Sequence, residues 1–172
     1  MNILYIGDIV GKPGKLALET SLQKLRDQYD INLCIGNGEN ASGGFGITPE
    51  IADELFGLGI DVITSGNHIY DKKEIIPILD RSSTILRPAN YPAEAPGKGS
   101  CVVKANNGQL VGVLNLIGRV FMDTADCPFK KADTEVSKLK AKTPIIFVDM
   151  HAEVTSEKSA MGWYLDGRAT AV

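Results

Sequence analysis

Cysteine is scarce in this sequence, and long apolar runs are absent. The 172 residues contain three cysteines, which are widely spaced and form no C-x-x-C pair: Cys34, Cys101 and Cys127. A disulfide framework is therefore not expected, and a reducing cytoplasm is the predicted location. No apolar run approaches the ~20 residues needed to cross a bilayer, and the first residues do not resemble a cleavable leader, so we expect neither a membrane span nor a signal peptide.

A strong excess of charge of either sign is also lacking. The formal net charge is -3, hydrophobic residues make up 44% and charged residues 23%. This balance is typical of a globular protein and argues against an extended nucleic-acid surface, although it leaves room for a small site that takes one nucleotide. The length predicts a single domain over residues 1–172.

Short apolar runs alternate with helical patterns, which predicts one α/β domain with some antiparallel content. We expect strands at 2–7, 31–36, 60–66, 100–105, 109–118 and 144–150, and the start of another at 169–172. We expect helices at 13–28, 48–59, 71–79, 132–141 and 156–166, of which the third would begin with a capping box formed by Asp71 and Glu74. Asn106-Asn107-Gly108 predicts a hairpin turn, and the proline-rich residues 87–99 predict a surface loop.

Polar side chains gather where four of the expected strands end. The sequence has only two histidines, and both fall at such ends. Because ligands of α/β sheets bind at the carboxyl ends of the strands, these residues are the candidate site. They are Asp8 after the first strand, Glu39 and Asn40 after the second, Asn67 and His68 after the third, and Asp149 and His151 at the end of a later strand.

The turn after the first strand raises a choice between a phosphate-binding loop and a metal site. Gly7 is followed by three residues and then by Gly11-Lys12, one residue short of the Walker spacing. Pro13 stands where that motif has a hydroxyl residue, and proline has no amide hydrogen to give a phosphate. We therefore reject the phosphate loop and take Asp8 as a candidate metal ligand.

Carboxylates, side-chain amides and an imidazole form a ligand set that suits Mn, Fe, Zn or Mg. A carboxylate such as Glu39 can bridge two cations about 3.5–4 Å apart, a spacing that suits phosphoryl displacement. Each residue alone also has a structural explanation. Asp8 could cap a turn, Glu39 could be a solvated carboxylate, Asn67 could shape a turn and His68 could be a structural histidine. Asp149 is taken as a structural carboxylate or as a supporting one, which could hold an imidazole in its tautomer.

Four segments together resemble the calcineurin-like metallophosphoesterases, and more closely their YmdB-like bacterial subfamily. They are "GD" at 7–8, "GNGEN" at 36–40, "GNHIYD" at 66–71 and "HAEVTSEK" at 151–158. The broad family has D-x-H in its first motif, whereas Val10 occupies the third position here, as in the subfamily. The resemblance runs through all 172 residues and implies the α/β metallophosphoesterase fold, with central β-sheets flanked by helices.

The resemblance also implies a metal-dependent phosphodiesterase. Two divalent metal ions, with Fe or Mn preferred to Zn or Mg, would bind the hydroxide that attacks a small phosphoester. The 2',3'-cyclic nucleotides are a candidate substrate class. Asp8 would bind the first metal, and Asn40 would bind that metal or orient the substrate near it. Glu39 would bridge the two metals, and Asn67 and His151 would bind the second. His68 would be the general acid or would stabilise the charge of the transition state, and would not be a metal ligand. An imidazole suits proton transfer because it exchanges protons near neutral pH.

The family's pattern continues with a Gly-Thr-His-Thr-His motif that the 172 residues do not contain. The resemblance therefore leads us to expect a fold that is incomplete at the C-terminus and lacks one ligand for each metal. An incomplete sheet would expose an edge through which copies of the chain could associate. The alternative function is a non-catalytic remnant that binds a cation or a nucleotide in a regulatory role.

Overall fold

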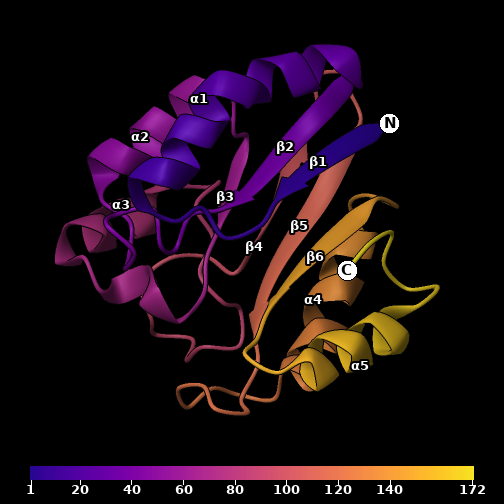
Figure 1. Cartoon of the computed structure of the whole chain (residues 1–172). Helices are drawn as coiled ribbons and strands as arrows, with labels where there is room; N and C mark the ends of the chain where they lie inside the picture. The colour runs from indigo at the N-terminus through magenta and orange to yellow at the C-terminus, as the bar shows by residue number, and fades with distance from the viewer.

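The computed structural model describes residues 1–172 and contains two three-stranded sheets. Figure 1 shows the strands running side by side between two groups of helices. The first sheet has the order β1-β2-β3 and is parallel throughout; the second has the order β4-β5-β6, with β4 antiparallel and β6 parallel to β5. The strands are β1 (Asn2–Ile6), β2 (Ile31–Asn37), β3 (Val62–Thr64), β4 (Ser100–Lys104), β5 (Leu110–Ile117) and β6 (Ile146–His151).

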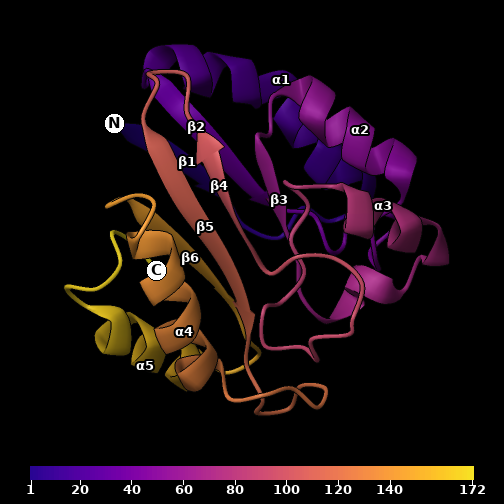
Figure 2. The same cartoon turned by 180° about the vertical axis from the view of Figure 1, so that it is seen from behind.

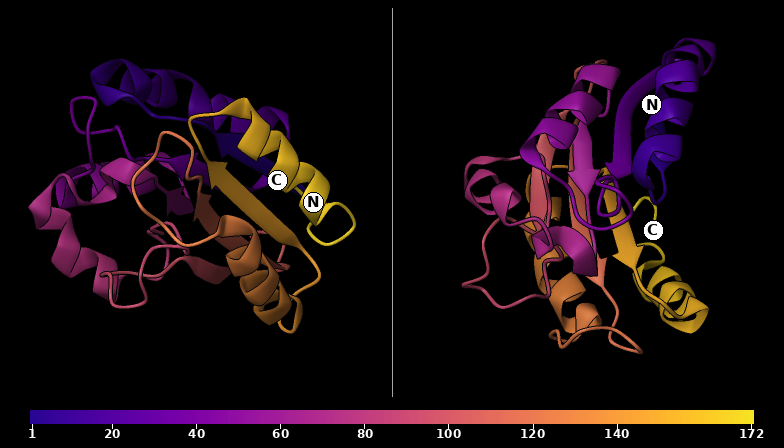
Figure 3. Two further views of the ribbon diagram at one scale, coloured as in Figure 1. Left: turned by 90° about the horizontal axis from the view of Figure 1, so that it is seen from below. Right: turned by 60° about the vertical axis from the view of Figure 1, so that its left-hand side comes forward.

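Helices cover the outer face of each sheet. They are α1 (Gly11–Gln28), α2 (Pro49–Leu58), α3 (Ile76–Arg81), α4 (Pro128–Lys140) and α5 (Thr155–Leu165), with the short 3-10 helices η1 (Asn67–Tyr70) and η2 (Lys73–Ile75) after β3. Figures 1 and 3 show α1, α2 and α3 on the side of the first sheet and α4 and α5 on the side of the second. No helix combines the length and the apolar character that a membrane crossing requires.

The alternation of side chains along the strands explains why four layers form. In β2, Cys34 packs toward α1 and α2, whereas Leu33 and Ile35 belong to a cluster shared with the second sheet. In β5, Val111 and Val113 face that same cluster, while Leu114 and Leu116 pack with α4 and α5. Because successive side chains of a strand point to opposite faces, a strand that is apolar on both faces needs cover on both. The two sheets therefore stack face to face, each with helices behind it.

Local sequence signals account for several element boundaries. The Thr48 hydroxyl accepts a hydrogen bond from the Ile51 amide, and α2 ends at Gly59 with φ 110°. Because only glycine adopts that backbone conformation readily, the helix stops there. Residues 106–108 form the predicted hairpin turn between β4 and β5, and Figure 2 shows it reaching the start of β2, where the Asn106 amide donates to the Asn32 carbonyl.

One local prediction is wrong, and two hold only in part. Asp71 and Glu74 form no capping box; the chain makes η1 and η2 there, and Asp71 binds a histidine instead. Of the surface loop predicted at 87–99, residues 92–99 are exposed or half-buried, whereas residues 87–91 are buried and the Asn90 side chain bonds the backbone of Ile117 in β5. The expected strand at 169–172 is reduced to a single bridge between Phe147 and Ala171.

Candidate active site

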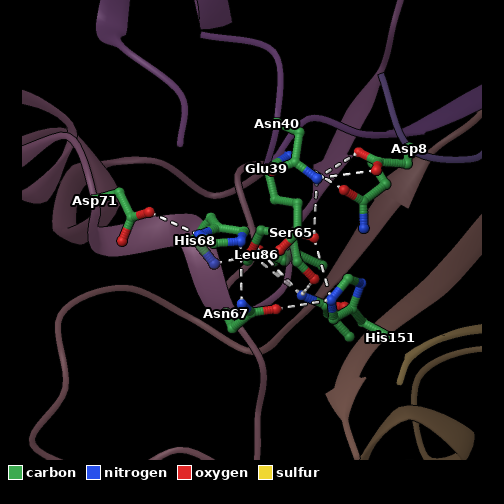
Figure 4. A network of polar contacts seen from close by, with 11 residues as sticks. Asp8, Glu39, Asn40, Ser65, Asn67, His68, Asp71, Leu86 and His151 are labelled. Atoms are coloured by element: carbon green, nitrogen blue, oxygen red, sulfur yellow. Dashed lines mark hydrogen bonds and ion pairs between the residues drawn. The ribbon is translucent and has the colours of Figure 1, made fainter. Parts of the chain in front are cut away.

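The sequence-predicted site residues converge at one edge of the structure. The parallel register pairs Ile6 with Gly36 and Asn37 with Thr64, so the strands β1, β2 and β3 end close together. The second sheet adds the end of β6, where His151 pairs with Ile117 of β5. Figure 4 shows the side chains pointing toward one another from these separate segments. The structure brings together Asp8, Glu39, Asn40, Asn67, His68 and His151.

Asn40 joins the first two strand ends. Its amide nitrogen Nδ2 lies 3.0 Å and 2.9 Å from the two carboxylate oxygens of Asp8, and 3.4 Å from Oε1 of Glu39. Its amide oxygen Oδ1 is buried and has no hydrogen-bond partner. An unpartnered buried oxygen is unfavourable unless something else interacts with it. The atom that faces the two carboxylates is Nδ2, so Oδ1 would reach a cation held by them only after the amide turns over.

Asn67 joins the two histidines. Its amide oxygen lies 3.0 Å from Nε2 of His151, and its amide nitrogen lies 3.2 Å from Nε2 of His68. His151 therefore donates through Nε2, and His68 accepts at Nε2 while its Nδ1 donates to Asp71 at 2.7 Å. The imidazole of His68 is held at both ring nitrogens, which fixes its orientation.

Glu39 is the most deeply buried acidic group of the site, with 2% of its surface exposed. Oε1 lies 3.1 Å from Nε2 of His151, and Oε2 accepts from the His68 amide at 3.3 Å. Burial raises the pKa of this carboxyl to about 7, and the hydrogen bond from the His68 backbone only partly opposes that rise. No Lys or Arg side chain forms an ion pair with it. A buried anion with so little compensation favours a cation beside it.

His151 is held in its neutral form. Burial lowers its pKa, and the nearby Asp8 opposes this only in part. A neutral imidazole is the form that binds metal ions, and the proton now on Nε2 is the one that a cation would displace.

The site is closely packed, and the absence of a side chain at Gly66 allows this packing. A Cβ at this position would collide with Glu39 and with the His151 ring. Behind it, Ser65 donates to the Leu86 carbonyl at 2.6 Å, and the Asn115 amide donates to the Ser65 carbonyl at 2.9 Å. The turn that carries Asn67 and His68 is thus fixed from β5.

Sequence reasoning missed Asp71 as a partner of His68, although the spacing of three residues within "HIYD" is a usable signal. Of the two roles expected for Asp149, structural or supporting an imidazole, the structure shows no contact for the second. Its carboxylate makes no hydrogen bond to His151, and one oxygen, Oδ2, has no partner. Asp149 and His151 are two positions apart in β6, a separation of about 6–7 Å, so the short Asp149 side chain does not reach the His151 ring. Burial raises the pKa of Asp149.

The donor set fits a divalent cation only if side-chain amides take part. Counting His, Cys, Asp and Glu alone, no group of three or more could hold a metal ion. The centre would therefore depend on amide oxygens as well. The unpartnered Oδ1 of Asn40 would meet that need once the amide turns over, because Nδ2 is the atom that faces Asp8 and Glu39 in this structure. Carboxylate, amide and imidazole donors fit Mn, Fe, Zn or Mg.

A cavity of about 600 Å³ opens beside this cluster, which is large enough for a small ligand. It is lined from β1, β6 and α5, and it reaches Asp8 and His151. Glu39, Asn67 and His68 are not part of its lining.

Known proteins resemble this chain in sequence along its whole length. The model of the YmdB-like protein family matches residues 4–172. The 2',3'-cyclic-nucleotide 2'-phosphodiesterase of Bacillus subtilis is 49% identical over 172 residues, which are the whole of this chain and 65% of that protein. The chain thus spans just under two thirds of that relative's length.

Solved structures are similar over almost the whole chain. A hypothetical protein from Thermus thermophilus superposes with a TM-score of 0.91 at 40% identity, covering 100% of this chain and 66% of that one. A phosphatase from Mycoplasma pneumoniae gives 0.89 at 30% identity, covering 98% and 61%. The expected metallophosphoesterase fold is confirmed. The chain belongs to the YmdB-like protein family.

Proposed function

We propose that the chain is a metal-dependent phosphodiesterase that hydrolyses phosphoester bonds of small molecules. The observation that carries the proposal is the connected set at the strand ends, in which every predicted site residue contacts another. Functional sites are where acidic, amide and imidazole groups from separate segments gather around a buried, poorly compensated carboxylate.

In this proposal, five side chains hold two divalent cations, with Mn or Fe the first choices. They are Asp8, Glu39, Asn40, Asn67 and His151. Bound cations would supply Lewis-acid stabilisation of phosphoryl oxygens and lower the pKa of an attacking water. Glu39 suits the bridging role, because its two oxygens face opposite parts of the cluster: Oε1 toward Asn40 and His151, and Oε2 toward the His68 amide.

His68 is the proton donor of the proposed reaction. Its Nε2 contacts the Asn67 amide at the inner side of the cluster, while Nδ1 is tied to Asp71. Nε2 accepts from Asn67 in this structure, so the proton donor would be the imidazolium that forms when Nε2 gives up that contact and takes a proton. The Asp71 carboxylate at Nδ1 would stabilise this imidazolium, whose Nε2 proton passes to the departing alkoxide. Asp71 acts through His68 and is therefore a positioning residue.

The substrate class proposed is the 2',3'-cyclic nucleotides. The name of the Bacillus subtilis relative supports it, at 49% identity. A five-membered cyclic phosphodiester is compact and reaches a closely packed centre more easily than an internal phosphate of a polymer does. The net charge of -3 also disfavours long polyanions.

Turnover by the metal-stripped and Mn²⁺-loaded chain tests the proposal. We expect hydrolysis of adenosine 2',3'-cyclic phosphate and of bis-p-nitrophenyl phosphate only after loading, and loss of that hydrolysis with EDTA. Absence of metal-dependent turnover with both substrates would reject an enzyme and favour the second candidate, a non-catalytic protein that binds a cation or a nucleotide. The observation that favours this non-catalytic candidate is that no three His, Cys, Asp or Glu side chains cluster so as to hold a metal ion.

A further inference from the structure

Phe45 is an exposed aromatic side chain that lies directly against the candidate site. Its surface is 59% exposed, although it is a large apolar group. Its ring centroid lies 5.1 Å from that of His68, with an angle of 75° between the rings, which is an edge-to-face contact. Trp163 and Phe121 are more exposed still, but neither stacks on a residue of the site.

The loop that carries Phe45 is built to hold it there. The Gly44 amide donates to the Asn40 carbonyl at 3.1 Å, and the Ser42 amide donates to the Gly46 carbonyl at 2.9 Å. Gly44 has φ 100° and Gly46 has φ 74°, conformations that only glycine adopts readily, so the backbone turns on both sides of Phe45. The loop is thereby tied to Asn40, a residue of the site itself.

Every other group of the site offers hydrogen bonds or charge, whereas Phe45 offers a flat apolar surface. One contact of the ring is with His68, and most of its area faces solvent. When a phosphoester binds with its departing oxygen at His68, the alcohol that contains this oxygen lies next to the imidazole. If this alcohol is a nucleoside, its base comes beside Phe45, and an aromatic face is what a base stacks on.

We propose that Phe45 is the stacking platform for the nucleobase of the substrate, an inference that rests on the proposed function and deepens it. The cavity beside Asp8 and His151 is a poorer position for the base, because His68 is not in its lining. Stacking tolerates any base but grows with its area, so purine substrates are preferred to pyrimidine ones.

The first test compares a substrate with a base and one without. For the parent, Phe45→Ala and Phe45→Trp, kcat/KM is measured with adenosine 2',3'-cyclic phosphate and with glycerol 1,2-cyclic phosphate. We expect the ratio of the two values to fall about tenfold in Phe45→Ala, and Phe45→Trp to restore it. Trp163→Ala, which removes an exposed aromatic group from α5, is the matched control and leaves the ratio at the parent value.

An unchanged ratio in Phe45→Ala would overturn the inference, even if both substrates slowed. That result would mean that the phenyl ring only supports the His68 imidazole. Phe45→Leu adds a check, because leucine retains apolar bulk without an aromatic face and should give a ratio close to that of Phe45→Ala.

If no substrate turns over and the proposed function fails, a measurement of nucleotide binding still tests whether Phe45 stacks on a base. Phe45→Trp is made in a Trp163→Phe background, so that position 45 holds the only tryptophan. Adenosine 3'-phosphate should quench its fluorescence, and glycerol 2-phosphate should not. Quenching by the nucleotide alone would retain Phe45 as a base platform in a non-catalytic nucleotide binder; equal effects, or none, would overturn it.

Discussion

Replacing Glu39 by glutamine should stabilise the metal-free chain while it removes metal binding. The carboxyl is 2% exposed, and burial raises its pKa from 4.5 to about 7. Above pH 7 the folded chain must therefore keep a poorly solvated negative charge that the unfolded chain exposes to water. Glutamine has almost the same shape and carries no charge, so it relieves this penalty.

The size of the effect follows from the change in pKa. Each unit corresponds to about 1.4 kcal/mol, so a rise from 4.5 to about 7 corresponds to about 3 kcal/mol at high pH. Glutamine can accept with only one of its two terminal atoms, so the contact with the His68 amide or with His151 is lost, at about 1 kcal/mol. The expected net gain is about 2 kcal/mol, or roughly 4–8 °C in Tm for a chain of this size.

The sign of the pH dependence makes the test specific. Between the unfolded pKa of 4.5 and the folded value of about 7, the folded chain binds more protons than the unfolded chain, so this carboxyl lowers stability progressively as pH rises. Thermal unfolding with EDTA at pH 5 and pH 8 should therefore give a small difference between Glu39→Gln and the parent at pH 5 and the full difference at pH 8. Adding Mn²⁺ at pH 8 should raise the Tm of the parent and leave the variant unmoved.

The control is Glu19→Gln, which removes an exposed carboxylate of α1 and should change Tm by less than about 1 °C at either pH. The reasoning would be refuted if Glu39→Gln were less stable than the parent at pH 8 in EDTA. It would equally be refuted if its gain were the same at both pH values, because the carboxyl would then not carry a buried charge.

The remaining predictions concern the proton donor and the packing of the site. His68→Ala should retain Mn²⁺ and lower kcat by about 10²–10⁴-fold, and loss of metal would contradict its assignment as a proton donor. Asp71→Asn should retain Mn²⁺ and lower kcat on the order of 10–100-fold, because it acts through the imidazole; a kcat equal to that of the parent would remove its positioning role. Gly66→Ala should weaken Mn²⁺ binding and destabilise the fold by roughly 2 kcal/mol, since its methyl group collides with Glu39 and His151. Gly57→Ala, whose methyl group meets nothing within 4 Å in α2, should be neutral or stabilising, and equal losses in both variants would count against the packing argument.

Much of the fold could be predicted from the sequence because its local signals agree with its packing. The run "INLCIG" is apolar on both faces of a strand, and it is buried on both. Thr48 and Gly59 mark the ends of α2 through a side-chain cap and a left-handed residue, and neither depends on distant contacts. The convergence of the strand ends also followed from a general property of parallel sheets.

The rest depended on contacts that no local pattern encodes. Asp71 looked like a helix cap, but the imidazole three residues earlier competes for its carboxylate. The proline-rich segment after Leu86 looked like a surface loop, yet Asn90 binds the backbone at Ile117 and is fully buried. Likewise, the edge-to-face contact of Phe45 with His68 joins residues 23 positions apart.

Saturable binding of Mn²⁺ to the metal-stripped chain, followed by electron paramagnetic resonance, tests the central claim most directly. The parent should bind Mn²⁺ saturably, Asp8→Ala and Glu39→Ala should lose that binding, and Asp27→Ala, on the exposed face of α1, should retain it. Equal binding by the parent and Asp8→Ala, or no saturable binding by the parent, would contradict the claim that these strand-end side chains form one cation site.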